Sequence, residues 1–541
     1  MIVELISLLF SPVGILLSII VALAYYHAKT RPEFFRKQGI KFIEPSPLLG
    51  NMIGPMTNRI TYAEHYKKIY DAFPDEPVVG MFEFLKQVHL IKDPELIKQI
   101  QIKEFDSFTN HRVVVDHETD PVFGRNLFVI KDQRWREMRT ILSPAFTGAK
   151  MRFLFELIRQ CAQNGVDYIS KEAKSKGGLY EFEAKDFFTR CSNDVIATSA
   201  FGIEVNSIKD KENEFYNNAR KLNDFGVILS LKFFTALNMP SVLKWFGLRI
   251  LDVPTSNYFR DTVLEAMKYR EKHNVVRPDM IQLLLQAKTK GVIDDDQEST
   301  NGHSNGNRVN GTNNNNTPKP QGSIKWTDDD FVAQSVLFFL AGFDTTSTLF
   351  SFMAYELARH PEIQEKLFEE VNDLKQELNG KNPSYEDITK MKYMEQVMNE
   401  TLRLWPPSIA SDRACNKSVT LEDSNGNKFK FNAGDGAFIS TFALHRDPKL
   451  FPNPERFDPE RFSDENKASI NPFAFQPFGL GPRQCIGNRF AIMECKVLFF
   501  YIMSRFKIEP SAKTEIPLKL KLGVFQNIPA NGMWLQYKCR E

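Results

Sequence analysis

The sequence of 541 residues predicts a mainly α-helical fold with a small β portion and one N-terminal transmembrane helix. Helical patterns of apolar residues dominate from about residue 132 to 290 and again after Thr327. Alternating segments joined by turn residues indicate two short β-hairpins, one over residues 78–91 and one around Asn425-Gly426. A long uncharged run near the N-terminus predicts the membrane-spanning helix.

The uncharged run extends over 22 residues from Leu5 to Tyr26. As a helix it would be about 33 Å long, which is enough to cross a hydrocarbon core. It is too long for the apolar region of a cleaved signal peptide, and no basic segment precedes it. Basic residues follow it, which by the positive-inside rule places the body of the protein in the cytosol. We expect residues 1–27 to be an anchor and residues 28–541 to form the body.

Residues 290–324 interrupt the body with a segment rich in Asn, Gly, Ser and Asp. This segment has little to bury, so we expect a disordered insertion within one domain. The net charge of +2 gives no reason to expect nucleic-acid binding. The six cysteines are scattered and form no CxxC pair, which argues against a disulfide framework and a zinc site.

A glycine-rich loop over residues 478–487 contains Cys485 and leads into an apolar helical pattern that begins at about Asn488. A cysteine just before a helix N-terminus can be stabilised as a thiolate by the helix dipole and by free backbone N–H groups. A buried structural cysteine is the more ordinary explanation. A phosphate-binding loop is opposed by the missing Lys-Ser/Thr ending.

A capped, acidic start at Thr327 predicts a long helix that ends at about Arg359. Residues 341–348 in its middle read Ala-Gly-Phe-Asp-Thr-Thr-Ser-Thr, and most of these are poor helix formers. Such a local conflict often marks a functional site. A helix crossing that needs small side chains explains the same residues equally well.

Two further pairs of residues have helical spacing. Glu400 and Arg403 share a helix face, where a surface ion pair would contribute little stability. Trp135 and Arg139 lie one turn apart, and an indole N–H beside a guanidinium suits a buried carboxylate. An ordinary amphipathic helix would show the same pattern.

Taken together, these motifs resemble those of the cytochrome P450 family. The loop around Cys485 is similar to the family's cysteine signature, and residues 341–348 are similar to its oxygen-activating motif. Glu400 and Arg403 match its ExxR motif, and residues 459–462 match its PERF segment. The resemblance covers nearly everything after the anchor except the insertion. Other segments look most like insect enzymes of the xenobiotic-metabolising type.

The resemblance implies a set of site residues. Cys485 would bind the iron of haem b through its thiolate. The other haem-binding residues would be Trp135, Arg139, Arg413 and Arg483, with His111 or Arg112 as a weaker addition. The catalytic residues would be Thr345, as a hydrogen-bond donor on the oxygen-binding side of the haem, and Asp344, which would help to deliver protons. The residues expected to face the substrate are Phe338, Phe339 and Ala341. The structural triad that braces the cysteine loop would be Glu400, Arg403 and Arg461.

The implied function is that of a haem-thiolate monooxygenase. It would insert one atom of O₂ into a lipophilic xenobiotic, lipid or hormone and reduce the other to water. Electrons from NADPH would arrive through NADPH–cytochrome P450 reductase, with cytochrome b5 as an optional helper. The enzyme would lie in the endoplasmic reticulum membrane, with its catalytic domain in the cytosol. Two alternatives remain open: a family member that rearranges peroxides, and a non-enzymatic, membrane-anchored protein that binds lipophiles.

Overall fold

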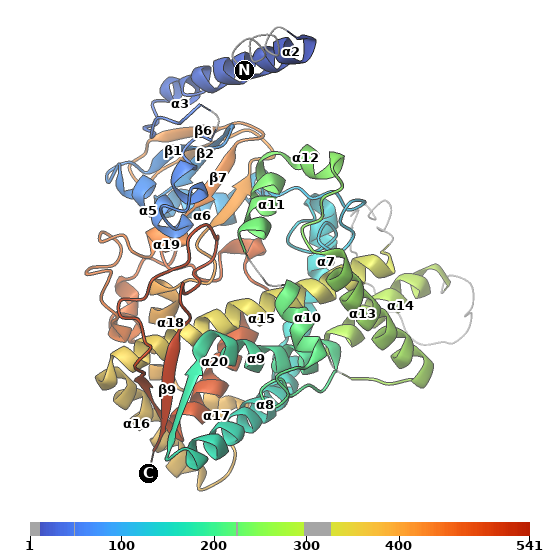
Figure 1. The fold of residues 1–541 in the computed structure, drawn as a ribbon, viewed down its shortest axis with the longest axis vertical. Coiled ribbons are helices and arrows are strands. Elements are labelled where there is room, and N and C mark those ends of the chain that lie inside the picture. Colours follow the sequence, from blue (N-terminus) through green and yellow to red (C-terminus); the bar gives the residue numbers. More distant parts are fainter. Residues whose placement is uncertain (1–10, 48, 223–225, 278, 297–325, 541) are drawn as a thin grey trace, which may run out of the picture.

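The computed structural model describes residues 11–47, 49–222, 226–277, 279–296 and 326–540. Helices make up most of this part of the chain, and its strands form three small sheets (Figure 1). The prediction of a mainly α fold with a small β portion is therefore confirmed. Most of the expected insertion lies outside the described residues, although helix α14 continues as far as Asp296.

The largest sheet has the strand order β1-β2-β7-β4. Its strands are β1 (Val78–Glu83), β2 (Lys86–Ile91), β7 (Gly436–Ile439) and β4 (Ser411–Ala414). Strands β1 and β2 form the predicted first hairpin, with Val78 opposite Ile91. Strand β7 pairs parallel to β2 and antiparallel to β4, and this pairing places Arg413 opposite Ala437.

Two smaller sheets complete the β portion. One has the order β3-β9-β8 and the other is a hairpin of β5 and β6. Their strands are β3 (Leu179–Glu183), β9 (Trp534–Cys539), β8 (Phe506–Pro510), β5 (Val419–Glu422) and β6 (Lys428–Phe431). The hairpin is the second one predicted, and Gly426 in its turn has a φ of 84°, which glycine adopts without strain.

The helices that precede residue 297 in the sequence lie around the sheets and the core. They are α2 (Pro12–Thr30), α3 (Glu33–Gln38), α4 (Ile53–Met56), α5 (Tyr62–Asp71), α6 (Pro94–Lys98), α7 (Asp132–Leu142), α8 (Gly148–Ser175), α9 (Ala184–Ile196), α10 (Glu214–Leu222), α11 (Val227–Asn238), α12 (Pro240–Trp245), α13 (Val253–His273) and α14 (Met280–Asp296). The later helices are α15 (Asp328–Arg359), α16 (Pro361–Leu378), α17 (Tyr385–Thr389), α18 (Lys392–Leu404), α19 (Thr441–Leu444) and α20 (Asn488–Met503).

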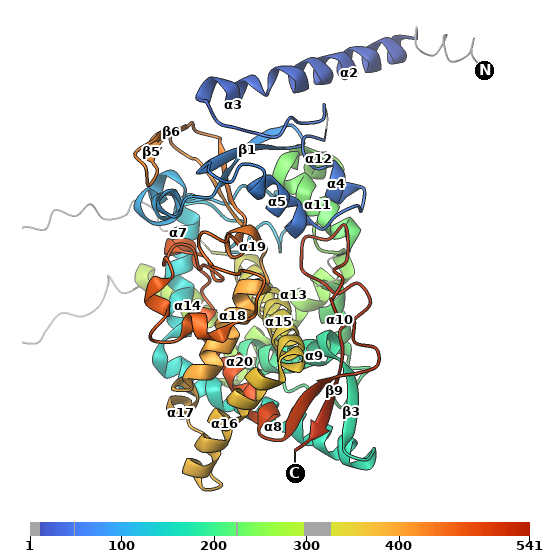
Figure 2. The same cartoon turned by 90° about the vertical axis from the view of Figure 1, so that its left-hand side faces the viewer.

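Helix α15 is the predicted central helix, and it crosses the middle of the body (Figures 1 and 2). Thr327 and Asp330 form the capping box at its start. Its acidic first turn is held by ion pairs to three other helices: Asp328 to Lys288, Asp329 to Arg260 and Asp330 to Arg134. These ion pairs fix the N-terminal end of α15, from which the helix leads to residues 341–348.

Gly342 marks a close approach between α15 and α9. A Cβ atom at this position would lie 2.5 Å from the Ile196 side chain. The helix-crossing explanation of the small residues therefore holds for Gly342. It does not account for the polar residues that follow, which are described with the cavity below.

Among the described residues, only α15 combines the length and the hydropathy of a membrane span, and 61% of its apolar window is buried inside the protein. That burial is typical of a core helix. Helix α2, which is 19 residues long, includes residues 12–27 of the predicted anchor and extends beyond the body at one end (Figure 2). Residues 1–10 of the predicted anchor lie outside the described part of the chain.

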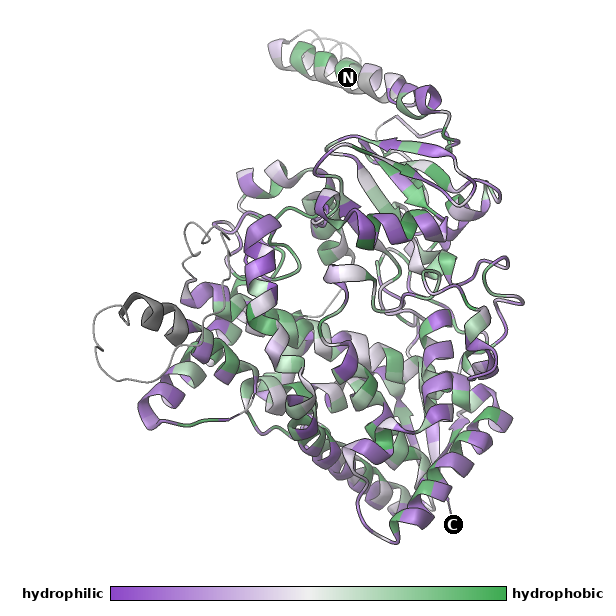
Figure 3. Cartoon of the chain, turned by 180° about the vertical axis from the view of Figure 1, so that it is seen from behind, coloured by the Kyte–Doolittle hydropathy of each residue, from purple (hydrophilic) through white to green (hydrophobic). Residues whose placement is uncertain are grey.

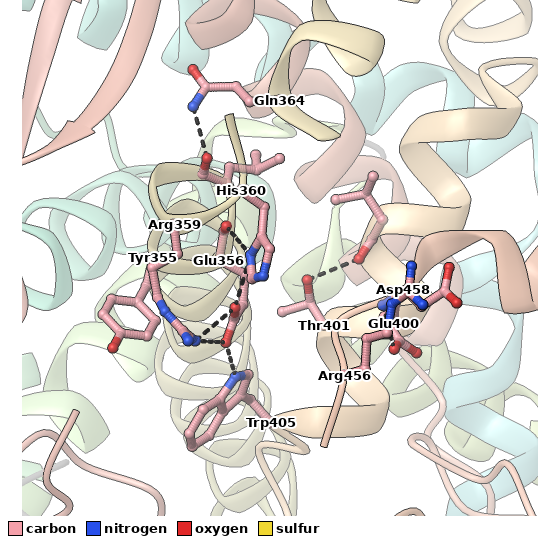
Figure 4. A network of polar contacts seen from close by, with 12 residues as sticks. Tyr355, Glu356, Arg359, His360, Gln364, Glu400, Thr401, Trp405, Arg456 and Asp458 are labelled. Carbon is pink, nitrogen blue, oxygen red and sulfur yellow. Dashed lines mark hydrogen bonds and ion pairs between the residues drawn. The ribbon is translucent and has the colours of Figure 1, made fainter. Parts of the chain in front are cut away.

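A buried ion pair connects α18 to the irregular segment that precedes the cysteine loop. Arg403 donates two hydrogen bonds to Glu400, at 2.7 Å and 2.8 Å, and both side chains are fully buried. The backbone N–H of Asp458 donates to the Glu400 carboxylate at 2.8 Å (Figure 4). The Nε of Arg461 approaches the same carboxylate at 3.4 Å. Arg403 also donates to the carbonyls of His445 and Arg456. The three residues expected to form a triad therefore lie together.

We expect Arg403→Met to lower the free energy of unfolding by about 3–5 kcal/mol, because it leaves the Glu400 carboxylate buried without its partner. Denaturant titration of purified protein measures this loss. The control is Lys366→Met, which breaks the exposed Lys366–Glu460 pair and should change stability far less. Equal losses in the two variants would contradict the structural role of Arg403.

Candidate functional site

A cavity of about 610 Å³ lies in the middle of the body, and its walls are mostly apolar. The cysteine loop forms one wall and the middle of α15 contributes to another. The remaining walls come from residues 111–128, from Leu222, from the lid region over residues 229–251 and from the C-terminal loop at Phe525. Segments that are far apart in the sequence therefore surround one space.

The cysteine loop is held by backbone geometry. The N–H of Cys485 donates to the carbonyl of Phe478 at 2.9 Å, and the N–H of Gln484 donates to the carbonyl of Gly481 at the same distance. Gly481 has a φ of 70°, and a Cβ atom there would lie 1.9 Å from the carbonyl oxygen of Gln101. Glycine is therefore required at this position. Helix α20 follows at Asn488, as predicted, and Gly487 caps it.

The thiol of Cys485 is accessible from the cavity, whose apolar walls offer little solvation. Burial raises the pKa of Cys485, and the backbone N–H of Gly487 and the guanidinium of Arg139 oppose this effect only in part. The effect of the helix end, which lowers the pKa of Cys485 as predicted, is therefore smaller than the effect of burial, which raises it. A coordinated metal ion would reverse that balance, because it deprotonates a thiol outright.

Three guanidinium groups line the cavity near Cys485: those of Arg139, Arg413 and Arg483. Arg483 donates to three backbone carbonyls at 2.9–3.0 Å and lies 4.1 Å from the ring of Trp135. Arg139 donates to the carbonyl of Gln484 at 2.8 Å. The Nε of Arg413 is buried without a hydrogen-bond partner in the described structure. The partners of these cations are thus largely neutral.

The pKa of Arg483 reflects the lack of an anionic partner for these guanidinium groups among the described residues. Burial lowers the pKa of Arg483, and repulsion from Arg413 and Arg139 lowers it further. The nearby carboxylate of Asp412 is already bonded to the Nδ1 of His111 at 2.9 Å and to the backbone N–H of Arg112 at the same distance. The wall therefore carries positive charge that suits an anionic ligand.

These residues fit a haem group. The described residues contain no group of three or more His, Cys, Asp and Glu side chains that could hold a metal ion. A metal at Cys485 would therefore have to bring most of its own ligands, as the iron of a haem does. The apolar cavity suits the macrocycle, and the guanidinium groups suit its two carboxylates.

The weaker candidates His111 and Arg112 differ in their surroundings. His111 stacks on Phe128 with ring centroids 4.4 Å apart, and burial lowers the pKa of His111 to about 4, so its imidazole is neutral at pH 7. Arg112 bonds to the buried carboxylate of Glu83 at 2.7 Å. The guanidinium of Arg112 thus already has a counter-charge, unlike that of Arg413.

On α15, Thr345 and Asp344 line the same cavity as the cysteine loop. The Thr345 hydroxyl donates to the carbonyl of Ala341 at 2.5 Å, a bond that threonine commonly makes within a helix. The Asp344 carboxylate accepts from the Nζ of Lys185 at 2.9 Å and from the Nε2 of Gln526 at 2.8 Å. Neither Lys185 nor Gln526 belongs to a sequence motif, so sequence analysis could not have predicted its contact with Asp344.

Phe338 and Ala341 line the cavity as expected, but Phe339 does not. The prediction for Phe339 was wrong because one residue further along a helix turns the side chain by about 100°. Phe339 is fully buried and packs against Phe201, Phe215 and Phe259 in the core.

Sequence analysis also missed Glu494, a buried carboxyl on α20. Burial raises its pKa to about 8, and Ser192 and Thr346 lower it in part. Thr346 donates to the hydroxyl of Ser192 at 2.9 Å, so this polar group lies beside α15. A glutamate inside an otherwise apolar helical pattern was the available signal.

Comparison with known proteins agrees with this geometry. The model of the cytochrome P450 family matches residues 41–535. The chain is 41% identical over 528 residues to probable cytochrome P450 9f2 of Drosophila melanogaster, which covers 96% of this chain and 98% of that protein. It is 41% identical over 532 residues to cytochrome P450 9e2 of Blattella germanica, with 96% of each chain covered. The chain belongs to the cytochrome P450 family and is a monooxygenase.

Proposed function

We propose that Cys485 binds the iron of haem b and that the enzyme oxidises lipophilic small molecules with electrons from NADPH. The observation that carries this proposal is that the thiol of Cys485 and the three guanidinium groups line the same apolar cavity. Arg139, Arg413 and Arg483 would bind the two carboxylates of the haem, and Trp135 would support Arg483 through the stacking contact. Haem bound here would supply the activation of O₂.

Thr345 and Asp344 have separate roles in this proposal. The Thr345 hydroxyl faces the cavity and donates a hydrogen bond on the oxygen-binding side once it turns from the carbonyl of Ala341. Asp344 supplies protons to the same side. The largely apolar lining from the lid region and Phe525 favours lipophilic substrates.

Electrons would reach the haem from NADPH through NADPH–cytochrome P450 reductase, with cytochrome b5 as an optional helper. This source is expected for the family. It also separates the proposal from a family member that rearranges peroxides, since that reaction would proceed without NADPH.

We expect reduced, carbon-monoxide-bound wild-type protein to show the strongly red-shifted Soret band of thiolate-bound haem, and Cys485→Ser to lack it. The difference spectrum measures this directly. The control is Cys539→Ser, a change in β9 that should keep the band. A folded, haem-loaded Cys485→Ser protein with the unchanged band would exclude Cys485 as the ligand.

Thr345→Ala should keep the red-shifted band but lower the product formed per NADPH consumed several-fold, with the difference released as hydrogen peroxide. The reason is the loss of the hydroxyl donor on the oxygen-binding side. Product, NADPH and peroxide are measured together. The matched control is Thr262→Ala on α13, because Thr262 also donates to a carbonyl four residues earlier. Unchanged coupling in Thr345→Ala would refute its role.

The proposal includes attachment to the endoplasmic reticulum membrane by residues 1–27, with the body in the cytosol. Helix α2 exposes Leu16 and Leu23 and is hydrophobic in its central part (Figure 3). Helices α11 and α12 lie at the same end of the molecule (Figures 1 and 2). Ile228 on α11, Trp245 on α12 and Phe246 directly after α12 are each more than 70% exposed. An exposed apolar group of this kind fits the lipid surface.

Full-length protein in vesicles with brominated acyl chains should therefore show quenching of Trp245 fluorescence. Trp245→Phe should remove most of the quenched signal, because the indole enters the acyl region in the wild type. Trp534→Phe is the control, since Trp534 lies in β9 at the opposite end of the body (Figure 1). If both variants are quenched to the same extent as the wild type, the lid region does not enter the membrane.

A further inference from the structure

Lys185, at the start of α9, directs its ammonium group at the polar segment of α15. Its Nζ lies 2.9 Å from the Asp344 carboxylate and 3.1 Å from the Asp344 carbonyl. It also lies 2.8 Å from the hydroxyl of Ser347 and 2.7 Å from that of Thr348. Four oxygen acceptors of one helix thus surround one ammonium group, which saturates its three protons.

The second oxygen of the Asp344 carboxylate is held from another direction. Gln526 donates to it from Nε2 at 2.8 Å. Gln526 and its neighbour Phe525 both line the cavity. The carboxylate is therefore bonded on one side by a cation and on the other by an amide from a loop that contacts the cavity contents.

The position of Lys185 is rigid because α9 and α15 are joined at three successive places. Lys185 bonds to residues 344–348, Ser192 accepts from Thr346 at 2.9 Å, and Ile196 packs over Gly342. The side chains of Lys185 and Asp344 are only 22% and 13% exposed. An ion pair with this shielding is held more firmly than one on the surface.

We propose that Lys185 and Gln526 are positioning residues that hold the Asp344 carboxylate oriented for proton delivery to the cavity. In each delivery, Asp344 takes a proton from solvent, passes it to the cavity and returns to the carboxylate that Lys185 and Gln526 bind. Gln526 adjoins Phe525. A substrate that contacts this loop therefore affects Asp344 through Gln526 alone. This inference rests on the proposed function of Asp344.

The test uses full-length, haem-loaded enzyme with the reductase, NADPH and the probe 7-ethoxycoumarin. We expect Lys185→Met to lower the product formed per NADPH several-fold and to increase the solvent deuterium isotope effect, while the carbon monoxide band stays unchanged. Lys185→Arg should restore most of the coupling, because it keeps the cation. Gln526→Leu should change coupling in the same direction but less. The control Lys176→Met removes an exposed pair with Glu172 and should have no effect.

Wild-type coupling and isotope effect in Lys185→Met would overturn the inference, and so would a loss of thermal stability without a change in coupling. A double-mutant cycle of Lys185→Met and Asp344→Asn tests the contact without turnover. We expect the fall in Tm of the double variant to be smaller than the sum of the single falls, and additive falls would count against the contact. If the wild type forms no product with the probe, the proposed function is in question, and the cycle still tests the pair.

Discussion

The buried Glu400–Arg403 ion pair is the interaction on which the rest of the site depends. The chain between α19 and the cysteine loop contains only short helical turns, so regular secondary structure does not fix its course. Arg403 and Glu400 bond to its backbone at His445, Arg456 and Asp458 instead. Since a buried charge without its partner is strongly unfavourable, this arrangement confines the segment that leads to Cys485.

A second constraint is the unbalanced positive charge around the cavity. Arg139, Arg413 and Arg483 approach one another closely enough for the pKa of Arg483 to fall. Protein carbonyls satisfy many of their N–H groups but do not neutralise them. An anionic, largely apolar ligand would supply the missing counter-charge. These three guanidinium groups would therefore hold the carboxylates of such a cofactor.

The α9–α15 contact joins fold and chemistry in one place. Gly342 permits the close approach of the helices, and the polar residues that follow it use α9 as their support. Sequence analysis left open whether the small and polar residues of α15 served a crossing or a site. In the structure Gly342 lies at the crossing, while Asp344 and Thr345 line the cavity.

Much of the architecture could be predicted because it depends on local patterns. The capping box at Thr327, the hairpin turn at Gly426 and the helix start after Cys485 each arise from residues close together in the chain. The site residues could be named through resemblance, because their motifs are short and specific. The prediction for Phe339 failed because a motif does not state which side of a helix each member occupies.

The sequence by itself determined the class of fold, the family and the residues that carry its motifs, because these are recorded in local spacing and composition. Tertiary structure alone decided which side chains surround Asp344. Lys185 and Gln526 lie 159 and 182 residues from it along the chain. Neither belongs to a motif, and contacts between such distant positions form only when the helices and the C-terminal loop pack together around the cavity.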